Sequence, residues 1–337
     1  GRATSAGAGI ICPWMTGAED IAFYHLYAAG ARVHTELAAN LGADNLGYRQ
    51  NGALVVSADH AELDWIERLL AQRRTAAPEM GETPRLSPSR AKALFPPLHT
   101  RFGAVQITGG ARVDGRMLAA TLQHAAQELG AVSIAGEAVL IAPGSRVVGI
   151  RVGEETIAAD VVVVTAGAWS PALLQRLGLS LPIAPQRGQI LHLRLPHVDT
   201  SKWPVVLPLG EHYLVPFDDS RVVAGATREN GVGFDYRVTA DGQWQLLNEA
   251  LRVAPGLSAA TVIETRVGFR PLGPDARPLL GWVQGMEGLL VGNGLGAVGL
   301  TIGPLAGRLL ADAALGREPE IDLAPFDPLR GGVAAEQ

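Results

Sequence analysis

Cysteine, charge and basic runs are all scarce in this sequence of 337 residues. The single cysteine, Cys12, cannot form an internal disulfide or a thiolate metal site. This is typical of a reducing compartment, so the expected location is the cytoplasm, with a peripheral place on the inner membrane as the alternative. Charged residues make up only 18% of the chain, with 28 Lys and Arg against 33 Asp and Glu. Because no Lys/Arg-rich run stands out, the charge pattern argues against a nucleic-acid partner.

Several catalytic motifs are missing as well. The eight histidines form no His-Glu-x-x-His pattern and no pair with neighbouring acids at metal-ligand spacing, so we expect no metal site. The sequence has neither a Gly-x-Ser-x-Gly turn nor a Gly-x-x-x-x-Gly-Lys-Ser/Thr loop. Hydrolase and nucleotide-triphosphatase functions therefore lose their support.

One uncharged window, 288–307, is about as long as a membrane span. It contains seven glycines and Pro304, which would leave a lipid-facing helix weak and interrupted. Its apolar residues instead form the short run 289–291, which precedes a glycine turn. We therefore predict no transmembrane segment.

The chain does contain enough apolar residues, 47% of the total, for a well-buried core and about two domains. Apolar residues at helical spacing, with capping residues at the ends, predict helices over 21–41, 61–74, 90–95 and 114–129. Short apolar runs predict strands at 53–56, 132–134 and 160–165, the last buried on both faces, and a hairpin from 146–152 and 155–159. Strands such as 190–195, 213–217 and 222–226 predict an antiparallel sheet between 185 and 265.

Glycines from Gly292 to Gly299 form the most informative part of the sequence. Segment 294–299 fits the Gly-x-Gly-x-x-Gly fingerprint, after a strand and before an apolar helix. Only 38 residues follow Gly299, which leaves no room for the further strands of a dinucleotide-binding sheet. We interpret the segment as a helix N-terminus directed at part of a cofactor, with tight helix–strand packing as the alternative.

Two arginines and a tyrosine are candidates for binding a substrate anion. Arg266 and Arg270 lie four residues apart on an extended segment, so both project to the same side, and one or both could hold a carboxylate. A salt bridge with Asp275 or Glu264 explains either arginine nearly as well. The phenol of Tyr213 could donate a hydrogen bond to the same carboxylate, but a core tyrosine is the alternative.

Four blocks of sequence, in this order, resemble the D-amino-acid oxidase superfamily of FAD-dependent oxidoreductases, which includes glycine oxidase, sarcosine oxidase and D-amino-acid dehydrogenase. The blocks are ATSAGAG at 3–9, VTAGAWS at 164–170, PQRGQ at 185–189, and GFRP at 268–271 with the glycines of 292–299. They span nearly the whole chain, and their combination is far more specific than any one block.

The resemblance implies an α/β (α+β) fold. It comprises an FAD-binding Rossmann-like domain, whose N-terminal βαβ unit is missing here, and a substrate-binding domain with an antiparallel sheet. The implied FAD-binding domain consists of 1–44, 104–184 and 262–330. The implied substrate-binding domain consists of 45–103 and 185–261.

The resemblance also implies which residues bind the substrate and the cofactor. Arg270 matches the arginine that binds the substrate carboxylate, and Tyr213 lies about where the family places a tyrosine for the same purpose. The implied FAD contacts include the N-terminal segment beside the isoalloxazine and a residue near the adenine, Val139. The full set is Ser5, Ala6, Gly7, Gly9, Val139, Thr165, Ala166, Gly167, Trp169, Gly294, Leu295, Gly296, Ala297, Gly299, Leu300 and Thr301.

The sequence departs from the family pattern at its start, because the usual strand, Gly-x-Gly-x-x-Gly turn, helix and second strand are not present before Ala3. Without that unit the pyrophosphate loses a helix N-terminus and the sheet loses strands. The expectation is therefore that the sequence is a fragment that binds FAD poorly unless the missing segment is supplied.

For the complete protein, the resemblance implies oxidative deamination of a (D-)α-amino acid or an N-substituted glycine, by hydride transfer to flavin N5. Arg270 would orient the substrate, and no protein base is needed. The alternatives are oxidation of a 2-hydroxy acid or a secondary amine and, from another class, a non-catalytic flavoprotein-like subunit. The electron acceptor, dioxygen or a quinone, stays open.

Overall fold

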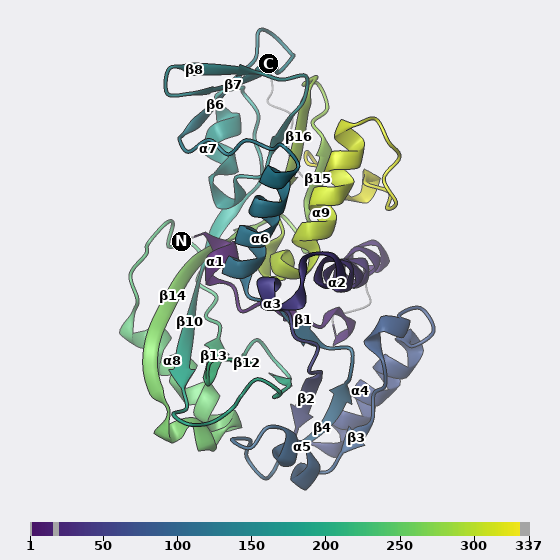
Figure 1. The fold of residues 1–337 in the computed structure, drawn as a ribbon, viewed down its shortest axis with the longest axis vertical. Coiled ribbons are helices and arrows are strands. Elements are labelled where there is room, and N and C mark those ends of the chain that lie inside the picture. The colour runs from purple at the N-terminus through teal and green to yellow at the C-terminus, as the bar shows by residue number, and fades with distance from the viewer. Residues whose placement is uncertain (1, 16–19, 331–337) are drawn as a thin grey trace.

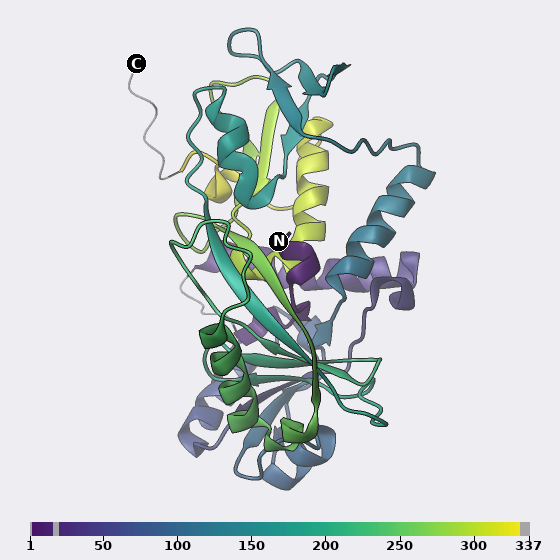
Figure 2. The same cartoon turned by 90° about the vertical axis from the view of Figure 1, so that its left-hand side faces the viewer.

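The computed structural model describes residues 2–15 and 20–330, which form two lobes along the long axis of the molecule (Figure 1, Figure 2). One lobe is built on a large sheet and the other on two small sheets. The α-helices in the described parts are α1 (Ala3–Ala6), α2 (Ile21–Leu41), α3 (Ala43–Leu46), α4 (His60–Arg73), α5 (Pro88–Leu94), α6 (Gly115–Glu128), α7 (Ser170–Gln175), α8 (Ala240–Val253) and α9 (Gly299–Ala314). None of these helices is both long and apolar enough to cross a bilayer.

The large sheet forms the lower lobe in Figure 1. In spatial order its strands are β14 (Thr261–Leu272), β10 (Ala184–Arg194), β13 (Arg221–Gly225), β12 (Tyr213–Phe217), β11 (Val205–Pro208), β2 (Ala53–Ser57), β4 (Gly103–Ile107) and β3 (Arg85–Leu86). Neighbouring strands are antiparallel except β11 and β2, which are parallel. The predicted antiparallel strands between 185 and 265 are therefore present, but the sheet is larger than predicted, because β2, β4 and β3 extend it through the parallel pair of β11 and β2.

Both faces of the large sheet are buried, because apolar residues occupy successive positions of its central strands. Val55 of β2 and Ile66 of α4 belong to the core on one face. Leu54, the neighbour of Val55 in the chain, belongs to the core on the opposite face, together with Leu246 of α8 and Ala91 of α5.

The upper lobe contains two three-stranded sheets (Figure 1). One has the order β15 (Leu279–Trp282), β16 (Leu289–Asn293) and β9 (Val162–Val164), in which β16 and β9 are parallel. The other is formed by β6 (Ala138–Ile141), β7 (Gly149–Val152) and β8 (Glu155–Ala158). A short pair, β1 (Ile10–Ile11) with β5 (Ala111–Arg112), lies near the junction of the lobes.

Most predicted elements are present, with helix 21–41 and the hairpin of β7 and β8 among them. The strand predicted at 132–134 is wrong, because that segment is irregular and its apolar side chains, Val132 and Ile134, are 83% and 47% exposed. The strand predicted at 160–165 exists as β9, but it is not buried on both faces. It is the outer strand of its sheet, and Val163 is 38% exposed.

The domain boundaries that the sequence suggested cut close to two strands of the large sheet. Strands β4 and β14 fall almost wholly in the predicted FAD-binding segments, yet both hydrogen-bond within the large sheet. We propose boundaries that follow the sheets, and the two-domain division stays a prediction.

Helices α2 and α9 cross at close range in the middle of the molecule. A Cβ atom added at Gly30 of α2 would lie 2.8 Å from the carbonyl oxygen of Thr301 in α9, so only glycine fits there. One turn further along α2, the buried His34 places its Nε2 2.9 Å from the Leu300 carbonyl oxygen. In a regular helix that carbonyl would accept from residue 304, but Pro304 has no N–H. His34 therefore supplies the missing donor.

The neutral ring of His34 suits this role. Both groups within reach of Nε2 are carbonyls, those of Leu300 and Thr301, so Nε2 must carry the hydrogen. Burial lowers the pKa of His34, which keeps the ring neutral. The side chain thus fixes the first turn of α9 without adding a charge.

Replacing His34 with Leu should lower the free energy of unfolding by about 1–3 kcal/mol, because the Leu300 carbonyl loses a donor in a site that Pro304 cannot serve. Urea unfolding followed by circular dichroism measures the loss. His34→Gln should recover part of it, and His25→Leu, at an exposed position of the same helix, is the control. Equal stability of the His34→Leu and His25→Leu variants would contradict this role.

Candidate active site

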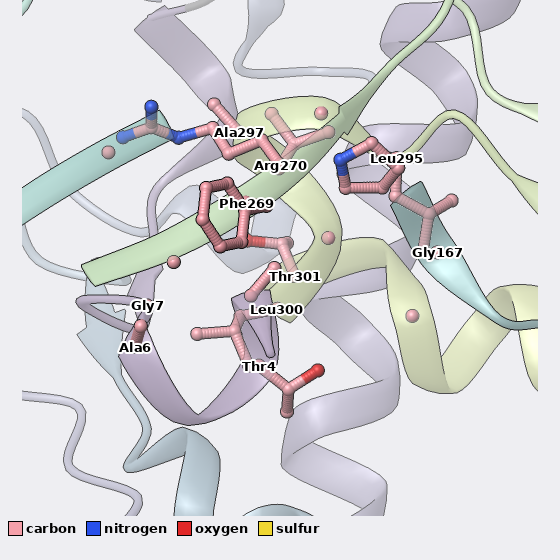
Figure 3. Close-up of a pocket in the computed structure, with 18 of the residues that line it drawn as sticks. Thr4, Ala6, Gly7, Gly167, Phe269, Arg270, Leu295, Ala297, Leu300 and Thr301 are labelled. Carbon is pink, nitrogen blue, oxygen red and sulfur yellow. The ribbon is translucent and has the colours of Figure 1, made fainter. Parts of the chain in front are cut away.

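A cavity of about 1550 Å³ lies between the two lobes. Its lining comes from the glycine turns of the upper lobe, from the N-terminal segment and from β12 and β14 of the large sheet, and part of it is shown in Figure 3. Pockets for drug-sized ligands usually have volumes of about 300–1000 Å³. This cavity therefore has room for a large cofactor together with a small substrate.

One wall of the cavity is made by the turns that follow the parallel strands β9 and β16. The carboxyl ends of neighbouring parallel strands meet at one edge of a sheet, which is where ligands bind in open α/β folds. Asn293, 1% exposed, ties the two turns together. Its Nδ2 donates to the Gly167 carbonyl oxygen at 2.9 Å, and its Oδ1 accepts from the Gly294 N–H at 2.8 Å.

Helix α9 begins at this wall and presents small residues to the cavity. Gly299, Gly303, Ala306 and Gly307 all line it. A Cβ atom added at Gly303 would meet no atom within 4 Å, so the space beside this helix is open. The helix N-terminus adds a partial positive charge and free N–H groups, which suit an electron-rich ligand atom.

The N-terminal segment passes along the cavity between α1 and β1, and Ala6, Gly7 and Gly9 line it. Gly9 has φ +77°, and a Cβ atom there would lie 1.8 Å from the Val113 carbonyl oxygen. Only glycine can adopt this conformation in that space. The N-terminal segment is therefore packed closely against the backbone at Val113.

Arg270 extends from β14 into the cavity (Figure 3). Its Nη1 donates to Gln186 Oε1 at 3.2 Å and to the Thr227 carbonyl oxygen at 3.1 Å. These acceptors are neutral, and within residues 2–15 and 20–330 no carboxylate lies at ion-pairing distance from this guanidinium. Burial lowers the pKa of Arg270, but an arginine stays charged at neutral pH. A mostly buried cation without a paired anion is a strong anion site.

Strand β10 supports Arg270 from the neighbouring position in the sheet. Gln186 pairs with Arg270 in the β10–β14 register. A Cβ atom added at Gly188 would lie 2.7 Å from the guanidinium, so glycine makes room for it. The segment PQRGQ, one of the four blocks that resemble the family, therefore lies directly beside the Arg270 guanidinium and leaves room for it.

Between these residues, Arg187 points to the other side and anchors the loop 228–238. It is 4% exposed and forms ion pairs with Glu229 and with Asp235, the latter at 2.7 Å. The anchored loop places Tyr236 against Phe269, with ring centroids 4.8 Å apart. Both rings line the cavity, so the loop forms part of its wall.

Tyr213 lines the cavity beside Arg270. Its ring lies over Gly225 of β13, where a Cβ atom would be 2.5 Å from the phenol oxygen. Burial raises the pKa of Tyr213, while the charge of Arg270 acts in the opposite direction. The phenol therefore stays protonated and can donate a hydrogen bond at neutral pH.

Arg266, the other arginine considered on β14, does not line the cavity in the described structure. Its Nη2 lies 2.5 Å from Glu264 Oε1. The salt-bridge alternative thus holds for Arg266, because the carboxylate of Glu264, two residues away on the same strand, already pairs with its guanidinium. Arg270 has no such neighbour.

The structure brings most of the cofactor-binding residues implied by the resemblance to this one cavity. Three lie outside the described lining: Ser5, whose hydroxyl donates to the Arg2 carbonyl, Gly294, which is buried under the Asn293 side chain, and Val139, whose neighbour Ala138 lines the cavity instead. The residues that do line it are Ala6, Gly7, Gly9, Thr165, Ala166, Gly167, Trp169, Leu295, Gly296, Ala297, Gly299, Leu300 and Thr301. Their individual contacts with a cofactor stay predictions.

Other lining residues escaped the sequence analysis. Asn293, Arg228 and Tyr236 are examples. Asn293 stands between two glycines at the end of a strand, which is a signal for a turn-bridging side chain. Arg228 and Tyr236 lie on the long connection between β13 and α8, and nothing in their local pattern indicates that it folds back over the cavity.

The sequence model of a family described as FAD dependent oxidoreductase matches residues 1–313 of this chain. The chain belongs to this family. It is accordingly an FAD-dependent oxidoreductase, and the expectation that FAD is its cofactor is confirmed.

Individual proteins show the same relationship. An oxidoreductase of Bacillus subtilis named YurR is 45% identical over 332 residues, which cover 97% of this chain and 89% of that protein. The crystal structure of iminodiacetate oxidase from Chelativorans sp. BNC1 is similar with a TM-score of 0.94 and 51% identity, over 97% of this chain and 90% of that one. Glycine oxidase from Geobacillus kaustophilus gives a TM-score of 0.86 and 30% identity, over 98% and 89%.

The residues of the cavity fit FAD. The volume exceeds that of a typical single-ligand pocket, and the open space beside Gly303 and the glycine turn at Gly296 lets a flat ring system approach the backbone. The N-terminus of α9 offers N–H groups to carbonyl or phosphate oxygens. We expect the turns after β9 and β16, the N-terminal segment and α9 to hold the cofactor together.

Replacing Gly303 with Leu should fill this open space and raise the Kd for FAD by roughly 5- to 150-fold, since overpacking costs about 1–3 kcal/mol. The protein without FAD should be no less stable, because Leu is the better helix former by roughly 0.5–1 kcal/mol. Titration with FAD followed by flavin fluorescence, together with thermal unfolding, measures both effects. Ala311→Leu, at an exposed position of α9, is the matched control. An unchanged Kd for Gly303→Leu would show that FAD does not lie along this helix.

Proposed function

We propose that the protein oxidises a small amine that carries a carboxylate, an N-substituted glycine or an α-amino acid, to the imine. The similarity to glycine oxidase and to iminodiacetate oxidase supports an FAD-dependent oxidation of amines or amino acids. Substrates of both named enzymes carry a carboxylate next to a carbon bound to nitrogen. The choice among such substrates is the part of the function that we propose here.

One observation carries this proposal: Arg270 is a mostly buried guanidinium in the cavity with only neutral partners among the described residues. A substrate carboxylate would supply the missing negative charge through charge-assisted hydrogen bonds. Tyr213 lies beside Arg270 and would donate a further hydrogen bond to the same carboxylate. The two groups fix one end of the substrate and so orient its α-carbon.

The reactive form of the amine is the neutral one, because only the neutral form has a free lone pair on nitrogen. FAD supplies the acceptor of the two electrons and of the hydrogen that leaves the α-carbon as hydride. As the C–H bond breaks, the nitrogen lone pair forms the C=N bond of a protonated imine; this gives its N–H proton to water, and water then hydrolyses the imine.

We propose dioxygen as the electron acceptor in preference to a quinone. Support comes from the two similar solved structures, whose names describe oxidases. Oxygen uptake and hydrogen peroxide release, measured with glycine derivatives as substrates, test this choice.

Replacing Arg270 with Leu should lower kcat/KM for a carboxylate-bearing amine by about 30-fold or more, mostly through KM, because truncating one partner of a buried charge pair costs about 2–5 kcal/mol. Arg266→Leu removes an equal charge from the same strand outside the cavity and should leave KM within about twofold. Steady-state kinetics on the FAD-loaded protein give both values. Similar losses in the two variants would refute a substrate-binding role of Arg270.

Replacing Tyr213 with Phe should lower kcat/KM by about tenfold or more, the value of one hydrogen bond to a charged group. Because burial raises the pKa of Tyr213, its proton is lost only at a pH above the ordinary range of tyrosine. The ratio of wild-type to variant kcat/KM should therefore stay constant from pH 7 to about pH 10. A ratio that declines toward one with a midpoint near pH 8 would contradict the raised pKa.

A further inference from the structure

The charges that line the cavity are unequal in sign. Four arginines, Arg2, Arg176, Arg228 and Arg270, face two glutamates, Glu137 and Glu211. Arg176 and Glu137 form a 4.0 Å pair with each other, near the glycine turn after β9. The part of the cavity next to Arg270 therefore contains more positive than negative charge.

Arg228 belongs to this same part. The residue before it, Thr227, accepts a hydrogen bond from Arg270 Nη1 at 3.1 Å, so the backbone of Arg228 starts beside that guanidinium. Its side chain reaches Glu211, with Nε and Oε1 3.1 Å apart. Glu211 lies two residues before Tyr213, on the connection between β11 and β12 that also lines the cavity. Arg228 thus lies between the backbone beside the Arg270 guanidinium and the connection of β11 and β12.

The ion pair between Arg228 and Glu211 is weak. The side chains of Arg228 and Glu211 are 39% and 64% exposed, respectively. An ion pair this exposed contributes only about 0–1 kcal/mol, because water and salt screen it. A ligand carboxylate that enters the cavity can therefore take the place of Glu211 at little cost.

We propose that Arg228 binds a second carboxylate of the substrate, so that the enzyme prefers amines with two carboxylates, one held by Arg270 and Tyr213 and the other by Arg228. This inference rests on the proposed function. When no substrate is bound, Glu211 forms an ion pair with Arg228. It therefore competes with the second carboxylate of the substrate for this arginine.

The electrostatics of the site agree with this arrangement. Burial lowers the pKa of Arg270, and the positive charge of Arg228 acts in the same direction. A ligand with one carboxylate can pair with only one of the two arginines. A ligand with two carboxylates neutralises both arginines, which is the better match for two neighbouring positive charges.

A matched pair of substrates tests the preference. Iminodiacetate and N-ethylglycine share the glycine half and differ in that only the first has a second carboxylate. We expect wild-type FAD-loaded enzyme to favour iminodiacetate in kcat/KM. Arg228→Gln should lower kcat/KM for iminodiacetate by about tenfold or more and change that for N-ethylglycine by less than about threefold, since a hydrogen bond to a charged group is worth about 1.5–3 kcal/mol.

Substitution of Glu211 separates this role from that of a structural salt bridge. Glu211→Gln removes the competitor, so the preference for iminodiacetate should rise, by about threefold. A purely structural pair predicts instead that Glu211→Gln and Arg228→Gln lower both activities alike. Arg252→Gln, which breaks the exposed pair of Arg252 with Glu249 on α8 outside the cavity, is the control and should leave the preference unchanged.

Binding of unreactive acids keeps this test independent of turnover. Titration calorimetry with glutarate and butyrate should give tighter binding of glutarate, and Arg228→Gln should remove that difference. If neither amine is oxidised but glutarate binding depends on Arg228, the proposed function fails and the two-carboxylate site stands. If both amines are oxidised and Arg228→Gln alters neither the preference nor glutarate binding, the inference about Arg228 is overturned.

Discussion

A mostly buried guanidinium with no paired anion among the described residues is the constraint on which the site depends. Arg270 has two neutral hydrogen-bond acceptors, Gln186 and the Thr227 carbonyl, within the described chain. Such a charge is costly in a folded protein unless something outside the chain neutralises it. The sheet nevertheless makes space for it at Gly188, where any side chain would collide with the guanidinium. The fold therefore keeps an unfavourable charge in place, which is typical of a binding site.

The upper lobe exposes backbone to a ligand in two ways, through the glycine turns after β9 and β16 and through the N-terminus of α9. Strands β9 and β16 end side by side, and Asn293 bonds the two glycine turns that follow them. Helix α9 then begins with small residues and contains Pro304, which leaves the Leu300 carbonyl of the first turn without its helical donor. His34 of α2 replaces that donor. The upper lobe thus offers N–H groups and open space, while the large sheet offers the cation.

Much of the site could be predicted because its residues have few structural alternatives. A run of glycines after an apolar strand indicates close approach to a ligand, and that turn does line the cavity. The roles of Gln186 and Gly188 could not be predicted, because they depend on the register between β10 and β14, which local pattern does not report. Arg266 and Arg270 look equivalent in the sequence, and only the pairing of Arg266 with Glu264 separates them.

The failed strand predictions have the same origin. Val132 and Ile134 have the apolar alternation of a strand, but a strand needs a partner, and none of the described residues pairs with them. Val163 is apolar in a short valine run, yet β9 lies at the edge of its sheet and leaves that side chain partly exposed. The apolar pattern of the sequence therefore predicts where helices and strands lie better than it predicts which strands pair with one another.

A crystal structure of the FAD-loaded protein with propionate, a carboxylate that has no amine to oxidise, tests the central claim most directly. The account predicts carboxylate oxygens at about 3 Å from the Arg270 guanidinium and from the Tyr213 hydroxyl, in the geometry of charge-assisted hydrogen bonds. Propionate bound elsewhere, with Arg270 still bonded only to Gln186 and Thr227, would contradict it.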